Sequence, residues 1–152
     1  NSMDTFLSDT MQIINAYPDF STSDIMKLIK RGNVTVESIR NFNLEDLKNL
    51  FIKGMQRSLK LFGDHCFRRS YGDMRRAPIN KALFEMWGSM LAMINENEYT
   101  NVYSNQKALK TEYYLLLNDI SFQNLISRDS WKYASVQKRF KKIDFLISKY
   151  KK

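Results

Sequence analysis

Glycine and proline are scarce in this chain, with only five Gly and two Pro among 152 residues. Between them, apolar residues recur every three to four positions, the spacing that places side chains on one face of an α-helix. Together these features predict an all-α fold of about six to eight helices. Because a chain of this length buries roughly two-thirds of its unfolded surface, a core can form without disulfides or metal. We therefore expect one compact helical domain over residues 1–152.

Residues typical of helix ends divide the chain. The expected helices cover residues 4–16, a short segment through Ile25 and Leu28 that stops at Gly32, 43–62, 78–94, 104–117, 120–126 and 135–150, with one or two further turns over 35–42. Asn43, Ser104 and Asp119 are the expected N-caps, because their short polar side chains can accept from free backbone N–H groups. Pro78 fits the first turn of its helix, where a missing N–H costs nothing.

Two helical stripes lead to specific expectations about the core. Leu44, Leu47, Phe51, Met55, Leu59 and Phe62 keep helical spacing along the third helix, which Gly63 closes. In the last helix, Val136, Phe140, Ile143, Ile147 and Tyr150 form the expected buried stripe. Between these helices the periodicity breaks over residues 64–77, which predicts an irregular basic loop.

The chain has a formal charge of +8, and the excess is localised. Residues 1–50 carry 5 basic and 7 acidic side chains, whereas residues 101–152 carry 11 basic and 4 acidic ones. A basic surface of this kind favours polyanions as partners, although charge alone does not define a fold's function.

Sequence features also bear on compartment and processing. The longest apolar stretch, residues 86–95, is about half of what a membrane span requires, and no signal peptide is evident, so we expect no membrane partner. The single Cys66 argues against a disulfide scaffold and favours the reducing cytoplasm. Asn1 and Ser2 before Met3 are typical of an expression scar, and we expect the chain to be a C-terminal fragment of a longer protein.

No residue pattern favours catalysis, a cofactor or a metal. His65 and Cys66 are adjacent, so their side chains point in different directions, and a structural role is the stronger interpretation. Asp19, Asp46 and Lys48 mimic a nuclease pattern, but Asp46 and Lys48 diverge by about 200° around a helix. Ser135 and Lys138 lack the companion motifs of an acyl-transfer site. We predict that this chain is not an enzyme.

Two basic surfaces are candidates for nucleic-acid binding. The arginine loop contains Arg68, Arg69, Arg75 and Arg76 with Phe67 and Tyr71 between them, and guanidinium groups match phosphate oxygens. The lysine face of the last helix consists of Lys138, Lys141, Lys142 and Lys149, opposite the expected core stripe, with Phe145 in its middle.

Each surface has a simpler explanation. Lysine-rich outer faces are often only solvated. Loop arginines often clamp carboxylates of the same protein, for which Asp73 and Glu85 are close in sequence. Phe145 is also a candidate protein-docking residue.

Several segments resemble a known family in order and spacing. They are Leu61-Phe62-Gly63-Asp64-His65-Cys66-Phe67-Arg68-Arg69, Arg76-Ala77-Pro78-Ile79-Asn80-Lys81-Ala82-Leu83-Phe84-Glu85, Leu116-Leu117-Asn118-Asp119 with Phe122, and Val136-x-x-Arg139-Phe140-x-x-Ile143. From about residue 50 to the end, the chain resembles the C-terminal helical region of the ParB-like, GmrSD-type restriction and phage-defence family, catalogued as a domain of unknown function. The segment from Pro78 to Glu85 carries most of the specificity, and the resemblance is weak before residue 45.

The resemblance implies a helical accessory part of a DNA-targeting protein whose ParB-like catalytic domain lies elsewhere. The signature of that domain is not found in this chain. The family pattern implies structural importance for Phe67, Pro78, Asn80, Leu83, Phe84, Glu85, Arg139 and Phe140, and adds Lys81 to the candidate nucleic-acid contacts. Asn80 is the residue expected to hold the arginine loop through its side chain. The implied partners are DNA and the ParB-like domain of the same protein, with docking on that domain or self-association as a homo-oligomer as the alternative.

Overall fold

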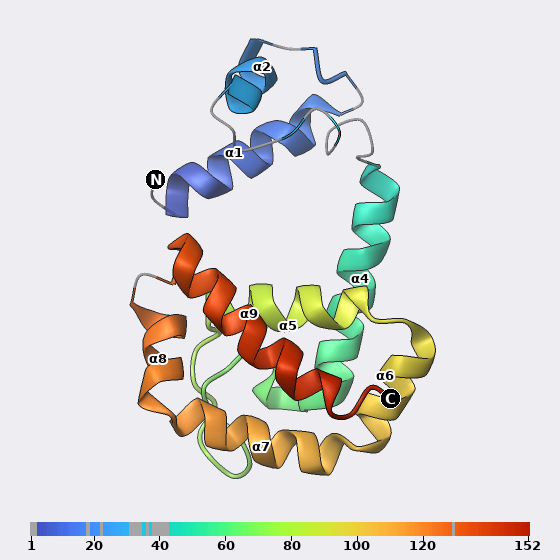
Figure 1. The fold of residues 1–152 in the computed structure, drawn as a ribbon, viewed down its shortest axis with the longest axis vertical. Coiled ribbons are helices and arrows are strands. Elements are labelled where there is room, and N and C mark those ends of the chain that lie inside the picture. Colours follow the sequence, from blue (N-terminus) through green and yellow to red (C-terminus); the bar gives the residue numbers. More distant parts are fainter. Residues whose placement is uncertain are drawn as a thin grey trace. The chain divides into compact units, whose positions relative to one another are not determined.

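The computed structural model describes residues 3–17, 19–21, 23–30, 35, 37, 43–128 and 130–152, and in these residues the fold is all-α. They form eight α-helices and one short 3-10 helix (Figure 1). The α-helices are α1 (Met3–Ala16), α2 (Ser23–Lys30), α4 (Leu44–Phe62), α5 (Lys81–Met93), α6 (Glu96–Ser104), α7 (Gln106–Asn118), α8 (Ile120–Ser127) and α9 (Tyr133–Ser148). The predicted fold class is confirmed.

The chain divides into two compact units, Asn1–Asn49 and Leu50–Lys152. In the first unit, Ile25 and Leu28 of α2 are buried, and Ile13, Ala16 and Phe20 pack against them. The expected helix stop at Gly32 and most of the turns expected over 35–42 lie outside the described residues. The assignment of a single domain stays a prediction.

The second unit encloses one apolar core. In Figure 1, α9 lies across α5 and alongside α7, and it also packs against α8. Trp87 of α5 is fully buried at the centre, where its ring meets those of Phe62 and Tyr113 at centroid distances of 4.7 and 5.0 Å. These edge-to-face contacts join α4, α5 and α7. Aromatic pairs of this geometry add stabilisation beyond the area that they bury.

Helices α4 and α5 approach closely where two glycines face each other. A Cβ atom on Gly54 would lie 2.2 Å from the backbone oxygen of Gly88, a distance that atoms cannot adopt. The buried side of α4 consists of Gly54, Arg57, Ser58, Leu61 and Phe62. Helical spacing therefore predicted the helix correctly but most of its buried face wrongly. Of the expected stripe only Phe62 is buried, and the exposed members are Leu44, Leu47, Phe51 and Leu59.

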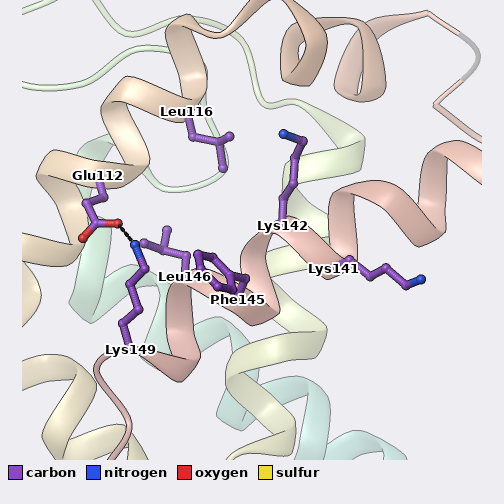
Figure 2. A pocket seen from close by; sticks show the side chains of 7 residues that line it. All are labelled: Glu112, Leu116, Lys141, Lys142, Phe145, Leu146 and Lys149. Carbon is purple, nitrogen blue, oxygen red and sulfur yellow. Dashed lines mark hydrogen bonds and ion pairs between the residues drawn. The ribbon is translucent and has the colours of Figure 1, made fainter.

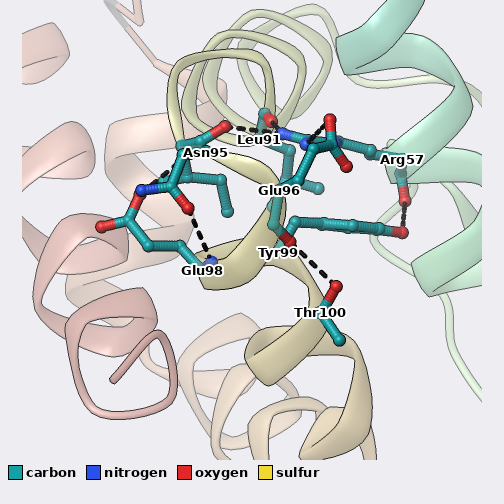
Figure 3. A network of polar contacts seen from close by, with 8 residues as sticks. Arg57, Leu91, Asn95, Glu96, Glu98, Tyr99 and Thr100 are labelled. Atoms are coloured by element: carbon teal, nitrogen blue, oxygen red, sulfur yellow. Dashed lines mark hydrogen bonds and ion pairs between the residues drawn. The ribbon is translucent and has the colours of Figure 1, made fainter.

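Arg57 is the most connected of these residues, and only 5% of it is exposed. Its Nη1 donates to the carbonyl oxygens of Leu91 and Ile94, both at 2.7 Å, and its Nη2 donates to Glu96 at 2.5 Å (Figure 3). The Tyr99 ring lies 4.6 Å from the guanidinium carbon. One arginine thus satisfies the carbonyls at the end of α5 and ties α4 to α6.

Several predicted helix ends are confirmed. Asn43 accepts from the backbone N–H groups of Glu45 and Asp46, and Asp119 accepts from that of Phe122. Gly63, which follows the last residue of α4, has a φ of 56°, a conformation that favours glycine.

Other boundaries differ from the predictions. Helix α5 begins at Lys81 with Asn80 as its N-cap, so Pro78 lies before the helix rather than in its first turn. Ser104 ends α6 rather than capping α7, because Glu96–Ser104 is a separate helix whose N-cap, Asn95, forms a capping box with Glu98. The last helix begins at Tyr133, two residues before the expected start.

Candidate nucleic-acid interface

The lysine face of α9 lies opposite the side of this helix that enters the core. Arg139, Ile143, Leu146 and Ile147 are the buried residues of α9. Lys138, Lys141, Phe145 and Lys149 are exposed, and Lys142 is half-buried. Phe145 lies about 200° around the helix from Ile143, so the ring cannot reach the core. The predicted placement of the five residues along one side of the helix is confirmed.

A groove of about 350 Å³ opens between this face and α7. Its lining residues are Glu112 and Leu116 of α7 with Lys141, Lys142, Phe145, Leu146 and Lys149 (Figure 2). In Figure 2 the Phe145 ring lies between Lys149 on one side and Lys141 on the other. The groove therefore combines an apolar floor with three ammonium groups and one carboxylate.

The single carboxylate of the groove is already paired. Lys149 Nζ donates to Glu112 Oε2 at 2.5 Å, and the Tyr150 hydroxyl donates to Glu112 Oε1 at 2.6 Å. The hydrogen bond from Lys149, followed by that from Tyr150, lowers the pKa of the Glu112 carboxyl below its ordinary value. Glu112 fixes Lys149 over the Phe145 ring, with Nζ 5.0 Å from the ring centroid.

The arginine loop is closed at its base by backbone contacts. The Asn80 N–H donates to the Phe67 carbonyl oxygen at 2.8 Å, and an isolated antiparallel bridge joins Arg68 and Ile79. Phe67 is buried with a φ of 59°, a left-handed conformation that a bulky residue adopts only when its surroundings enforce it. Its ring packs against Phe84 at 5.0 Å between centroids. The loop is thus an ordered structure with its ends together.

Side chains inside the loop hold its path. The Ser70 hydroxyl accepts from the Ala77 N–H at 2.9 Å and contacts His65 Nδ1 at 2.9 Å, while His65 Nε2 contacts the Gly72 carbonyl at 2.9 Å. Arg68 Nη1 donates to the Ala77 carbonyl. His65 therefore has the structural role that we expected. Arg68 braces the loop as well, which leaves the other three arginines as the candidate phosphate contacts.

Those three arginines lie on the outside of the loop. Arg69, Arg75 and Arg76 are exposed, as is Lys81 at the start of α5. Arg76 lies 3.8 Å from Asp64, an exposed ion pair of the kind that contributes little to stability.

Glu85 and the side chain of Asn80, which were expected to hold the loop, make other contacts. Glu85 accepts from Arg139 of α9, so it is not a clamp for the loop arginines. The Asn80 side chain accepts from the Leu83 N–H at 3.0 Å and donates to the Ile126 carbonyl at 2.8 Å. The backbone N–H of Asn80, rather than its side chain, holds the arginine loop.

Helix α7 separates the two basic surfaces. Tyr71 of the loop stacks on Tyr114 of α7 at 4.3 Å with an angle of 11° between the rings, and Asn118 donates to the Tyr71 hydroxyl at 2.6 Å. Residues 114 and 118 each lie about 200° around α7 from the groove residues 112 and 116. The arginine loop and the lysine face therefore lie on opposite sides of α7 and do not form one continuous surface.

A second, smaller cavity of about 230 Å³ lies beside Arg57. Lys53, Gln56, Lys60, Glu96 and Tyr99 line it with Arg57. Because Arg57 and Glu96 neutralise each other, only Lys53 and Lys60 contribute net charge. Pairing of Lys149 with Glu112 leaves the groove at α9 with two net charges as well, from Lys141 and Lys142. The groove at α9 is the stronger candidate site because its aromatic ring, Phe145, is exposed, whereas Tyr99 is buried.

The remaining candidate groups have ordinary environments. Cys66 is buried, and burial raises the pKa of its thiol to about 12, which suppresses the thiolate. Among the described residues, no group of three or more His, Cys, Asp or Glu side chains is arranged to hold a metal ion. Within the same residues, no helix has the length and apolar character needed to cross a membrane.

Comparison with protein-family models, curated proteins and solved structures finds no match to this chain. The resemblance to the GmrSD-type family stays a prediction that rests on the segments quoted above.

Proposed function

We propose that this chain is a noncatalytic helical module of a GmrSD-like DNA-targeting restriction or defence protein, and that it holds nucleic acid on the lysine face of α9. The observation that carries this proposal is the groove between α7 and α9, which Lys141, Lys142 and Lys149 line together with an exposed aromatic ring. Ammonium groups that neutralise phosphates release condensed counterions, which drives binding to any sequence.

The proposal is supported by the way these lysines are placed. Residues 138, 141, 142, 145 and 149 follow one stripe of α9 over about 16 Å at 1.5 Å per residue. Glu112, the carboxylate that lines the groove, is held by Lys149 and Tyr150. A linear polyanion that runs along this stripe meets successive positive charges.

The test compares variants that remove charge from different surfaces. Replacing Lys138, Lys141 and Lys142 by Gln removes three charges without touching the contact between Glu112 and Lys149. We expect this variant to bind a fluorescent duplex and a fluorescent oligothymidylate at least about tenfold more weakly, since each phosphate contact carries part of the affinity. Equal affinities of the variant and the parent protein would reject the lysine face as the binding surface.

Two further variants locate the site. The control replaces Lys107 and Lys152, both exposed and outside the groove, and should bind like the parent protein. A variant of Arg69, Arg75 and Arg76 tests the loop, and it spares Arg68, which braces the loop through Ala77. A loss of affinity confined to this loop variant would show that the arginine loop, on the other side of α7, is the binding surface.

The second candidate function is protein interaction, either docking on a ParB-like domain or self-association. The exposed positions of Phe145, Leu115, Ile120 and Tyr133 favour it, because apolar side chains that serve no core often serve an interface. The substitution Phe145→Asp distinguishes the two: a complex with the ParB-like domain, or a homo-oligomer, that dissociates in this variant supports docking.

A further inference from the structure

We propose that the groove between α7 and α9 takes single-stranded nucleic acid, with one unpaired base stacked on the ring of Phe145. This inference rests on the proposed function and deepens it, because it names the class of nucleic acid that the groove selects. It follows from the exposure of Phe145 and from the lysines and leucines that line the same groove.

Phe145 is exposed at a position where folding does not require an aromatic ring. It is 68% exposed and faces away from the buried side of α9. Single exposed apolar residues are common on proteins, so exposure alone decides nothing. What sets Phe145 apart is that its ring lies in the groove, beside Leu116 and Leu146 and among the lysines (Figure 2).

Three lysines line the same groove as the ring, and one of them contacts it. Lys149 lies over one face of the ring and is paired with Glu112, so the base of the proposed complex stacks on the other face of the exposed ring, and Lys141 and Lys142 supply the net charge. Lys141 and Lys142 precede Phe145 by one helical turn, so both belong to the same side of the helix. An aromatic platform among ammonium groups is the combination with which proteins bind single strands, since the charges follow the backbone while the ring stacks on a base.

A double helix cannot use this ring in the same way. In a duplex, the faces of the bases are covered by their stacked neighbours, and a side chain on a protein surface meets only phosphates, sugars and base edges. An unpaired base presents its whole face and can leave the stack to lie on an aromatic side chain. The apolar floor formed by Leu116 and Leu146 suits the flat face of a base and offers nothing to phosphates.

The same groove also fits the chemistry of an acidic protein segment, with an apolar side chain in place of the base. The backbone N–H groups of a bound peptide need hydrogen-bond acceptors. Among the described residues that line the groove, the only side chain that can accept is Glu112, and it is already paired. The observations favour the nucleic acid, and binding of oligoglutamate serves as the competing outcome of the test.

The experiment measures fluorescence anisotropy with an oligothymidylate and with an abasic strand of equal length and charge. We expect the oligothymidylate to bind about 5- to 150-fold more tightly than the abasic strand, which corresponds to one stacked base. Phe145→Leu should abolish this difference in affinity, and Phe145→Tyr should keep it. The triple variant Lys138→Gln/Lys141→Gln/Lys142→Gln should lower the affinity for both strands by the same factor. Because Phe145 is exposed, these substitutions leave the core intact.

The outcomes separate this inference from the function on which it rests. Equal affinities for the two strands and a duplex, unaffected by Phe145→Leu, would overturn the stacking site and leave nucleic-acid binding in place. Failure to bind any of the three nucleic acids would overturn both. Oligoglutamate that displaces the oligothymidylate from the parent protein at equal charge concentration would assign the groove to an acidic protein instead.

Discussion

Arg139 of α9 donates a hydrogen bond to the carboxylate of Glu85 in α5, although 54 residues separate them in the sequence. The arginine is only 1% exposed, and it also donates to the Ser130 carbonyl before α9. This pair fixes α9 against α5 and so orients the lysine face outward. Both residues belong to the segments that carry the family resemblance, where a structural role was predicted for each.

Loss of Glu85 should cost more stability than loss of Arg139. Glu85→Ala leaves a buried guanidinium without its counter-charge, and we expect the free energy of unfolding to fall by about 3 kcal/mol or more. Arg139→Met removes the buried charge itself, and the remaining carboxylate of Glu85, whose side chain is 36% exposed, is hydrated. Urea unfolding of both variants measures the difference. Equal losses of unfolding free energy in the two variants would contradict the claim that the buried guanidinium of Arg139 needs Glu85 as its counter-charge.

The close crossing of α4 and α5 predicts different stability effects for alanine at Gly54 and at Gly88. In Gly54→Ala the new methyl meets the backbone of Gly88, so the helices must separate at a cost of about 1–3 kcal/mol. Gly88→Ala is the matched control, because its methyl meets only the flexible end of Met55. Thermal unfolding should show a clear loss for Gly54→Ala and little loss, or a gain, for Gly88→Ala. The reverse order would show that the helices cross elsewhere.

Cys66 should resist thiol reagents in the folded protein. Its pKa of about 12 leaves almost no thiolate at neutral pH, and the side chain is buried. We expect the reaction with a disulfide reagent to be orders of magnitude slower than that of a free thiol, and to become fast in urea. Fast labelling under native conditions would contradict the burial of this residue.

Acid should destabilise the protein through carboxyl groups whose pKa values are lowered in the folded state, and Glu96, Glu112 and Asp119 are among them. Hydrogen bonds from Arg57, Lys149 and Ser121 lower the pKa values of Glu96, Glu112 and Asp119, respectively. A carboxyl with a lowered pKa binds fewer protons when folded, so its contribution is complete above the unfolded value of about 4 and is lost as the pH falls through the folded value.

The pH dependence can be assigned to a residue by substitution. The urea midpoint of the parent protein should fall as the pH decreases from neutral to about 3. Glu112→Gln should show a smaller fall, because this variant has one fewer group to protonate. A midpoint that stays constant or rises in acid would contradict the lowered pKa values.

Local features of the structure could be predicted from the sequence. The N-caps at Asn43 and Asp119 depend on residues two or three positions away, so the sequence contains all that determines them. The outward stripe from Lys138 to Lys149 follows from helical periodicity alone. Phe145 could be singled out because an apolar residue interrupts a charged face.

Long-range features could not be predicted in this way. The ion pair of Glu85 with Arg139 and the bonds of Arg57 to the end of α5 depend on how helices pack. Periodicity also left the buried face of α4 undetermined, since the close crossing at Gly54 places small and polar residues inward. The contribution of Glu112 and Leu116 of α7 to the groove likewise required the tertiary structure.

The salt dependence of binding tests the central claim most directly. The logarithm of the association constant for an oligothymidylate should fall linearly with the logarithm of the salt concentration. The triple variant Lys138→Gln/Lys141→Gln/Lys142→Gln should reduce the steepness of this slope by about 0.7 for each lost phosphate contact. The control variant of Lys107 and Lys152 should keep the parent slope. A triple variant with the slope and affinity of the parent protein would contradict the assignment of the lysine face of α9 as a nucleic-acid surface.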